Sequence, residues 1–186
     1  MRITLTTLLL SALFLLGCAD TPISPIKDDN HSYQFIKLPK KAGMSVETTF
    51  SITKTINGTA GGNIYLYESY VADDGHTVSL YVNLKVKRNS YDGDATITLT
   101  VDDEFAAVSF TPVMVFDKPL ILDLTFEGID LEGLDLTTGN YDFVFIDDDG
   151  TTGVVAYNTL HVNENQGKIW VIKAKLDHFS RYGFIN

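Results

Sequence analysis

The sequence predicts an all-β fold, an antiparallel β-sandwich that forms a single domain. Apolar and polar residues alternate along several segments, so that each segment has one apolar face, as a half-buried strand does. Turn sequences containing glycine separate these segments. No segment keeps a helical period beyond about two turns. A parallel sheet is excluded because its crossovers need helices, which leaves an antiparallel sandwich or barrel.

Four segments alternate most regularly. Each is expected to turn its apolar side chains into the core and the intervening side chains toward water. The four apolar rows are Val78, Leu80, Val82, Leu84 and Val86; Ala95, Ile97, Leu99 and Val101; Leu120, Leu122, Leu124 and Phe126; and Trp170, Ile172, Ala174 and Leu176.

Less regular segments complete the predicted set of strands. They are Thr49–Ile56, Asn63–Val71, Ala107–Phe110, Tyr141–Ile146 and Val154–His161. Turn chemistry lies between the segments at Asp74-Gly75, Asp92-Gly93, Thr138-Gly139-Asn140, Asp149-Gly150 and Gln166-Gly167. The chain ahead of Asn63–Val71 ends in Gly61-Gly62, where the backbone can turn sharply without a Cβ clash.

The N-terminus has the pattern of an export signal. Arg2 precedes a run from Leu8 to Leu16 that is apolar except for Ser11, and the sequence Leu-Leu-Gly then leads to Cys18. The run is too short to span a hydrocarbon core of about 30 Å as a helix. Residues 1–17 are therefore interpreted as a bacterial lipoprotein signal peptide, cleaved before Cys18, which would carry the lipid, including palmitate. An ordinary secretory signal is the alternative.

Two further predictions follow from this anchor. Ala19, rather than Asp, follows the cysteine, which in Gram-negative lipoproteins resembles sorting to the outer membrane. Residues 18–45 contain Pro22, Pro25 and Pro39 and few clustered apolar residues, so they are predicted to be a flexible tether ahead of a domain at 46–186. Tyr33–Leu38 is also suited to an edge strand laid on that domain.

The charge of the chain disfavours binding to nucleic acid or to an anionic bilayer surface, and its cysteine content rules out an internal disulfide. The chain carries a formal charge of −10, which disfavours nucleic acid, because affinity for nucleic acid depends on neutralising phosphates. An anionic bilayer surface should also repel it, so the lipid would provide the attachment to the membrane. Cys18 is the single cysteine, so no disulfide within the chain can stabilise the fold.

Several segments resemble, in order, the ZU-five domain of netrin receptors, ankyrins and tight-junction scaffolds. The resemblance covers roughly residues 49–184 and rests on Ile56-Asn57-Gly58-Thr59-Ala60-Gly61-Gly62, Phe110-Thr111-Pro112, Phe116-Asp117-Lys118-Pro119-Leu120 and Leu176-Asp177-His178-Phe179-Ser180-Arg181-Tyr182. The chain departs from the family at Lys87–Ser90, where a Pro-x-Gly-Ala turn is usual. The resemblance implies a β-sandwich with a non-enzymatic interaction role, and it names no ligand.

Three motifs suggest chemistry. Asn57–Gly62 is rich in glycine, but a strand rather than a helix follows it, so a phosphate loop is rejected.

The acidic turn Asp147-Asp148-Asp149-Gly150 offers oxygen ligands of the kind that calcium binds, but Asp149-Gly150 is also a good hairpin turn. The loops Asp102–Glu104 or Asp130–Asp135 could add further ligands to a calcium ion at this turn. In some ZU-five tandems a motif similar to His178-Phe179-Ser180 is cut before the serine. Here, packing of the last strand is the preferred interpretation.

No catalytic residues, metal ligands or cofactor are predicted. The histidines, His31, His76, His161 and His178, accompany no nucleophile elbow and have no zinc-ligand spacing. Tyr65, Tyr67 and Tyr81 lie on the less apolar sides of two strands. They could form a binding face, or they could cover a second packing surface, which is the favoured interpretation. The expected function is a non-enzymatic envelope lipoprotein that binds a protein or has a structural role. A calcium-dependent adhesion or glycan-binding module is the alternative, and self-cleavage at Phe179-Ser180 is the third.

Overall fold

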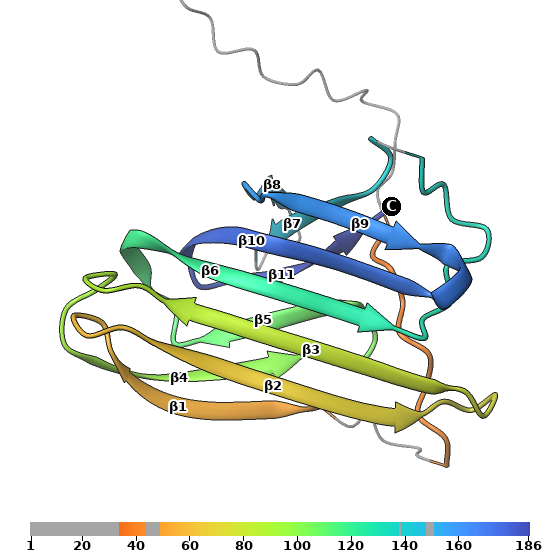
Figure 1. Ribbon diagram of the computed structural model, residues 1–186, viewed down its shortest axis with the longest axis horizontal. Coiled ribbons are helices and arrows are strands. Elements are labelled where there is room, and N and C mark those ends of the chain that lie inside the picture. Colours follow the sequence, from red (N-terminus) through yellow and green to blue (C-terminus); the bar gives the residue numbers. More distant parts are fainter. Residues whose placement is uncertain (1–33, 44–48, 138, 148–150) are drawn as a thin grey trace, which may run out of the picture. The chain divides into compact units, whose positions relative to one another are not determined.

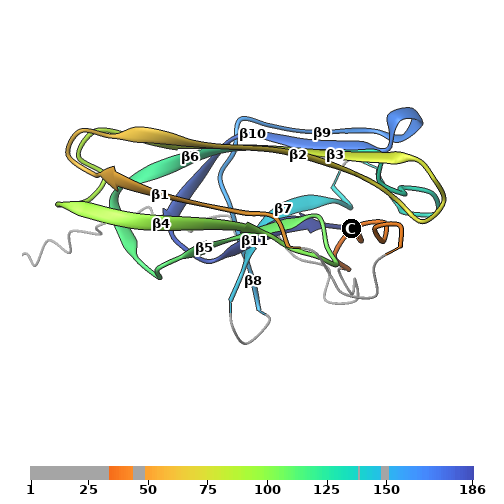
Figure 2. The same cartoon turned by 90° about the horizontal axis from the view of Figure 1, so that it is seen from below.

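The predicted β-sandwich is confirmed in a computed structural model, which describes residues 34–43, 49–137, 139–147 and 151–186. Within these residues the chain forms eleven strands and one short 3-10 turn, Glu164–Gln166. All paired strands are antiparallel, and they form two sheets. Figure 2 shows the two sheets as layers, one above the other.

Each sheet combines strands from both halves of the chain (Figure 1). In spatial order, the six-stranded sheet contains β1 (Ser51–Asn57), β4 (Asp94–Val101), β5 (Ala107–Thr111), β11 (Arg181–Ile185), β7 (Asp142–Ile146) and β8 (Thr152–Val154). The five-stranded sheet contains β2 (Gly62–Val71), β3 (Thr77–Val86), β6 (Val115–Glu127), β10 (Lys168–His178) and β9 (Thr159–Asn163).

The core lies between the two sheets, where the alternating apolar side chains of β3, β4 and β6 meet. The rows predicted at residues 78–86, 95–101 and 120–126 all point inward, and every member except the partly buried Ala95 is buried. Aromatic rings add to this packing: Phe179 stacks on Phe110 with ring centres 5.1 Å apart and meets Phe116 edge-on at 4.8 Å. Such ring pairs contribute beyond the area they bury.

Two of the predicted strands need correction. The segment Val154–His161, predicted as one strand, contributes to β8 and β9, which belong to different sheets. The fourth apolar row is only half right, because Ala174 and Leu176 are buried whereas Trp170 and Ile172 point outward. A β-bulge between Val171 and Ala174 inserts a residue, and a one-residue shift exchanges the two faces of a strand.

Residues 34–42, here called the strap, lie on the sandwich. Gln34 and Asn186 exchange backbone hydrogen bonds of 2.7 and 2.8 Å beside β11, and the Ala42 amide donates to the carbonyl of Val71 in β2 at 2.9 Å. The strap therefore contacts both sheets. The sequence placed these residues in the tether, with an edge strand over Tyr33–Leu38 as the alternative. In the structure the strap belongs to the compact unit, to which Phe35, Lys37 and Lys41 attach it by isolated β-bridges rather than as a regular strand.

Apolar packing explains why the strap does not behave as a polar linker. Ile36 is 1% exposed and belongs to the core. The ring of Phe35 packs against that of Phe105 at 5.6 Å, and the guanidinium of Arg181 lies over both rings. Arg181 also pairs with Asp102 at 2.7 Å. Among the described residues, no helix has the length and apolar character needed to cross a bilayer.

Candidate binding face

The outer side of the five-stranded sheet carries a row of aromatic side chains that runs across the strands. The strand register places Tyr67 of β2 opposite Tyr81 of β3, Tyr81 opposite Thr125 of β6, Thr125 opposite Trp170 of β10, and Trp170 opposite His161 of β9. Neighbouring strands lie about 4.8 Å apart, so the row crosses the whole width of the sheet. With Tyr65, the residues Tyr67, Tyr81 and Trp170 define the aromatic face.

The tyrosines of this face are exposed, and this outcome differs from the favoured expectation. Tyr65, Tyr67 and Tyr81 are 55%, 68% and 38% exposed. They face outward because Ile64, Leu66 and the other alternate residues of the same strands occupy the core. No layer of the described chain covers them, so the alternative interpretation, a binding face, fits the structure better. An exposed cluster of large rings marks a contact surface more often than scattered apolar residues do.

Trp170 is held in a fixed orientation by its neighbours. The imidazole of His161 packs against the indole with ring centres 5.1 Å apart. On an adjoining row, the ammonium of Lys168 lies 5.6 Å from the centre of the indole ring and pairs with Glu127 at 3.0 Å. Because two neighbouring side chains already contact its ring, Trp170 loses little conformational freedom when a ligand contacts it.

The bulge beside Trp170 places a lysine in an uncommon backbone conformation. Lys173 has φ of 56°, in the left-handed region that non-glycine residues rarely adopt. Its amide donates to Asp123 Oδ1 at 2.9 Å, and Asp123 Oδ2 accepts from the side-chain amide of Asn83 at 3.2 Å. Bulges commonly redirect a side chain at a functional surface. Here both Ile172 and Lys173 are exposed as a result.

Three lysines, Lys85, Lys173 and Lys175, also lie on the outer side of the five-stranded sheet, although the chain as a whole is acidic. Lys85 and Lys175 flank Ile121 in one row across the sheet, and Lys173 lies between that row and Trp170. All three lysines are exposed. Among the described residues, none of their ammonium groups has a carboxylate within ion-pair distance.

The outer side of the six-stranded sheet differs in chemistry. Here threonines face one another across β1 and β4, and their hydroxyls form hydrogen bonds: Thr53 with Thr98 at 2.8 Å and Thr55 with Thr96 at 2.9 Å. At the end of the same pair of strands, the side chain of Asn57 donates to Asp94 at 2.8 Å. These four threonines define the threonine face.

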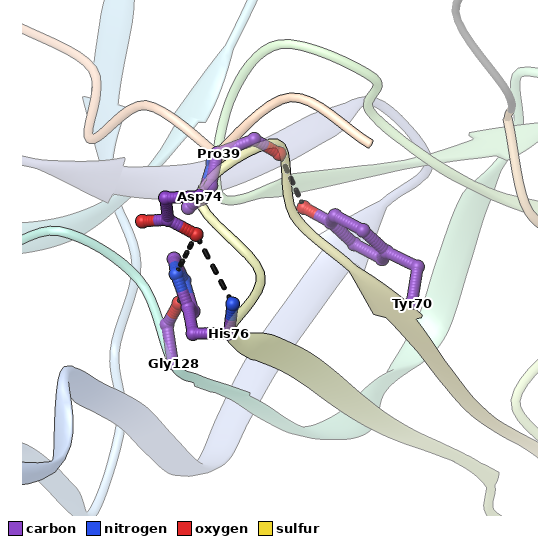
Figure 3. A network of polar contacts seen from close by, with 5 residues as sticks. All are labelled: Pro39, Tyr70, Asp74, His76 and Gly128. Atoms are coloured by element: carbon purple, nitrogen blue, oxygen red, sulfur yellow. Dashed lines mark hydrogen bonds and ion pairs between the residues drawn. The ribbon is translucent and has the colours of Figure 1, made fainter. Parts of the chain in front are cut away.

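A cavity of about 390 Å³ lies between the strap and the turn that joins β2 to β3. Figure 3 shows the polar contacts beside it. One nitrogen of the His76 ring pairs with Asp74, and the other lies 2.6 Å from the carbonyl oxygen of Gly128. The hydroxyl of Tyr70 donates to the Pro39 carbonyl at 2.8 Å, and burial raises the pKa of this phenol to about 12. The described contacts hold the strap and two loops together.

The geometry at Phe179-Ser180 does not favour self-cleavage. The Ser180 hydroxyl donates to the carbonyl of Ile146 at 2.8 Å, while the His178 ring packs edge-on against Phe145 at 5.0 Å. The attacking group and its supposed base thus have other partners. Phe179 is 1% exposed and lies in the core, and the Tyr182 hydroxyl donates to the His178 carbonyl at 2.6 Å. Both observations agree with a packing role for this segment.

The possible calcium ligands are engaged locally where the structure describes them. Asp102 accepts from two backbone amides and pairs with Arg181, and Asp130 accepts from the amide of Glu132. Within the described ranges, no three His, Cys, Asp or Glu side chains are grouped so that they could hold a metal ion. Residues 148–150 of the acidic turn lie outside those ranges, as does Cys18.

Comparison of the chain with protein-family models, with curated protein sequences and with solved structures found no match. The resemblance to the ZU-five domain therefore stays a prediction.

Sequence reasoning found three of the four rings of the aromatic face and missed Trp170. It assigned Trp170 to the core because the spacing from 170 to 176 is strictly alternating. It also missed Asp123 and Lys173, whose roles depend on the bulge. One signal was present: Ile169 and Val171 form a second apolar pair out of phase with Ala174 and Leu176, which is what an inserted residue produces.

Proposed function

We propose that this chain is a non-enzymatic binding module of a bacterial cell envelope, anchored by lipid on Cys18, which captures another macromolecule on its aromatic face. Outer-membrane attachment is the preferred location. Partner capture follows from the protein-binding role expected from the sequence, and a glycan is the other class of ligand considered there. The anchor would keep the module at the surface, where a modest affinity suffices because the ligand and the module are held close together.

The observation that carries this proposal is the exposure of three tyrosine rings on the outer side of the five-stranded sheet, in line with Trp170. Tyrosine and tryptophan dominate binding energies at interfaces because each combines a large apolar area with a polar group and loses few rotamers. Within the described residues, the side chains of Tyr67 and Tyr81 make no hydrogen bond and no ring contact. Their exposed area is therefore available to a ligand, whereas the hydroxyls of the threonine face are already paired with one another.

Photo-crosslinking in the cells that make the protein tests the binding face. A photoreactive phenylalanine analogue replaces Tyr67 in one strain and Thr96, on the threonine face, in another. We expect position 67 to capture a discrete species that the Thr96 position does not. Adding Tyr65→Ser and Tyr81→Ser should abolish that capture, after a thermal melt has shown that the variant folds. Equal capture from both faces, or capture that survives both serines, would contradict the proposal.

Metabolic labelling with a fatty-acid probe tests the anchor separately. The full-length protein is expected to incorporate the probe, and Cys18→Ser is expected to abolish incorporation, because Cys18 is the single thiol in the chain. Unlabelled wild-type protein, or equal labelling of both, would remove the lipid and the location inferred from it. The binding face would be unaffected by that result.

A further inference from the structure

We infer that the ligand of the aromatic face is an acidic polysaccharide that lies across the strands, along the row Tyr67, Tyr81 and Trp170. This inference rests on the proposed binding function and adds the chemical class of the ligand. Three observations support it: the spacing of the rings, the polar groups between them, and unpaired lysines beside them in an otherwise acidic chain.

The direction and spacing of the row suit an extended chain of sugar rings. Tyr67 and Tyr81 lie on adjacent strands, about 4.8 Å apart. Trp170 lies two strands beyond Tyr81, at roughly 10 Å, with Thr125 between them. One strand spacing is close to the length of one pyranose unit, so successive sugars could lie over successive strands. A pyranose presents C–H groups on its flat faces, and aromatic ring faces attract such weakly positive hydrogens.

Polar groups between and beside the rings match the hydroxyls at the edge of a sugar. The Thr125 hydroxyl lies within the row, and Asn83 and Asp123 lie in the next row. A folded protein partner would instead favour a more continuous apolar centre, since the centres of protein interfaces are depleted of charged and polar groups.

The lysines supply the preference for an acidic chain. The whole protein carries −10, yet Lys85, Lys173 and Lys175 gather on this one surface without carboxylate partners within ion-pair distance. Lys168 and Glu127 neutralise each other on the far side of the row. On the lysine side the carboxylate of Asp123 accepts from the Lys173 amide and the Asn83 side chain, and it pairs with none of the three ammonium groups. A uronate-type polysaccharide stacked on the rings would place carboxylates toward that side. Of the three lysines without a carboxylate partner, the two on β10 are Lys173 and Lys175, and Lys173 is the closer to Trp170 along that strand.

Affinity electrophoresis and calorimetry with the purified folded protein test this inference. The probes are polygalacturonate, alginate and hyaluronate, with fully methyl-esterified polygalacturonate as a control that keeps the rings and removes the charge. We expect at least one acidic probe to bind. Its affinity should fall as the salt concentration rises, because salt screens the attraction between the lysine ammonium groups and the carboxylates of the probe. The esterified control should bind at least about tenfold more weakly than its parent if polygalacturonate is the probe that binds.

Matched variants separate stacking from charge. Tyr81→Ser should weaken binding of every probe that binds by at least about tenfold. Lys173→Gln should lower the affinity for the acidic probe several-fold and make that affinity less dependent on salt. Lys40→Gln, on the strap, should change neither the affinity nor its salt dependence. The inference is overturned if no acidic probe binds, if the esterified chain binds equally well, or if Lys173→Gln and Lys40→Gln behave alike. Capture of a protein from position 67 together with no polysaccharide binding would overturn the ligand class and keep the binding function.

Discussion

The two outer faces of this sandwich are built from the same alternation of residues, yet they differ in what their side chains do. On the six-stranded sheet, Thr53, Thr55, Thr96 and Thr98 pair with one another, so the threonine face satisfies its own hydrogen bonds. On the five-stranded sheet, Tyr67 and Tyr81 face each other in the register but extend into solvent. A surface whose groups already pair gains little from a ligand, whereas exposed rings gain the area that a ligand covers.

The difference also appears in the backbone. The pairing of β1 with β4 runs from residue 51 to 57 without a register shift. By contrast, β10 contains a bulge with a lysine at positive φ, beside Trp170. Strained backbone persists where the surrounding structure fixes it and is concentrated at functional sites. The face with the irregular strand is thus the better candidate for binding on geometric grounds as well as chemical ones.

The largest effect is expected from the core, which supports both faces. Leu122 of β6 is fully buried between the sheets. Leu122→Ala should lower the free energy of unfolding by about 2–5 kcal/mol, through lost transfer energy and the cavity left behind. Ile121→Ala, the next residue on the same strand, points outward and should cost much less. Urea denaturation measures both, and equal losses would show that the faces of β6 are assigned wrongly.

Alkaline pH should loosen the strap. Burial raises the pKa of Tyr70 to about 12, and burial likewise raises the pKa values of Tyr157 and Tyr182. An unfolded phenol ionises near pH 10, so folding retains protons that the unfolded chain loses. This stabilisation is complete below about pH 10 and is lost as the pH rises through 12. The urea midpoint should therefore fall between pH 9 and about 11, and fall less steeply in Tyr70→Phe. An unchanged slope in that variant would contradict the assignment.

The bulge offers a sharper test of the comparison, because stability and binding should move in opposite directions. Lys173→Gly removes the cost of a left-handed lysine and should stabilise the fold by up to about 1 kcal/mol. It should also weaken ligand binding, since the ammonium is lost. Lys175→Gly, in regular strand backbone two residues away, should destabilise the fold by roughly 0.5–1 kcal/mol. Destabilisation by both glycines in thermal melts would show that φ at residue 173 is not positive in solution.

The smallest effects are expected on the threonine face. Thr53→Ala and Thr98→Ala should each cost less than about 1 kcal/mol, and together less than the sum of the two, because they remove the same cross-strand pair. Capture by a crosslinker at position 67 should be unchanged in both. Loss of capture in either variant would contradict the assignment of binding to the aromatic face alone.

The alternating rows at residues 78–86, 95–101 and 120–126 were predictable because in these parts β3, β4 and β6 are regular and keep one face toward the core. Strand β11 was not delimited, although it pairs between β5 and β7, since Arg181, Gly183 and its shortness hide the pattern. The exposure of Tyr65, Tyr67 and Tyr81 could not be read from their own strands. It depends on whether a further layer covers the sheet, and no local pattern encodes that.

The sequence by itself determined the fold class, because the period of its apolar residues matches strands, and it determined the charge of the chain. The export signal ending at Cys18 stays a prediction from the sequence. Only the tertiary structure decided which rings meet across strands, which way Trp170 points and where Lys173 lies. The physical reason is that alternation fixes the two faces of a strand locally. Register, bulges and the stacking of sheets depend on contacts between residues far apart in the chain.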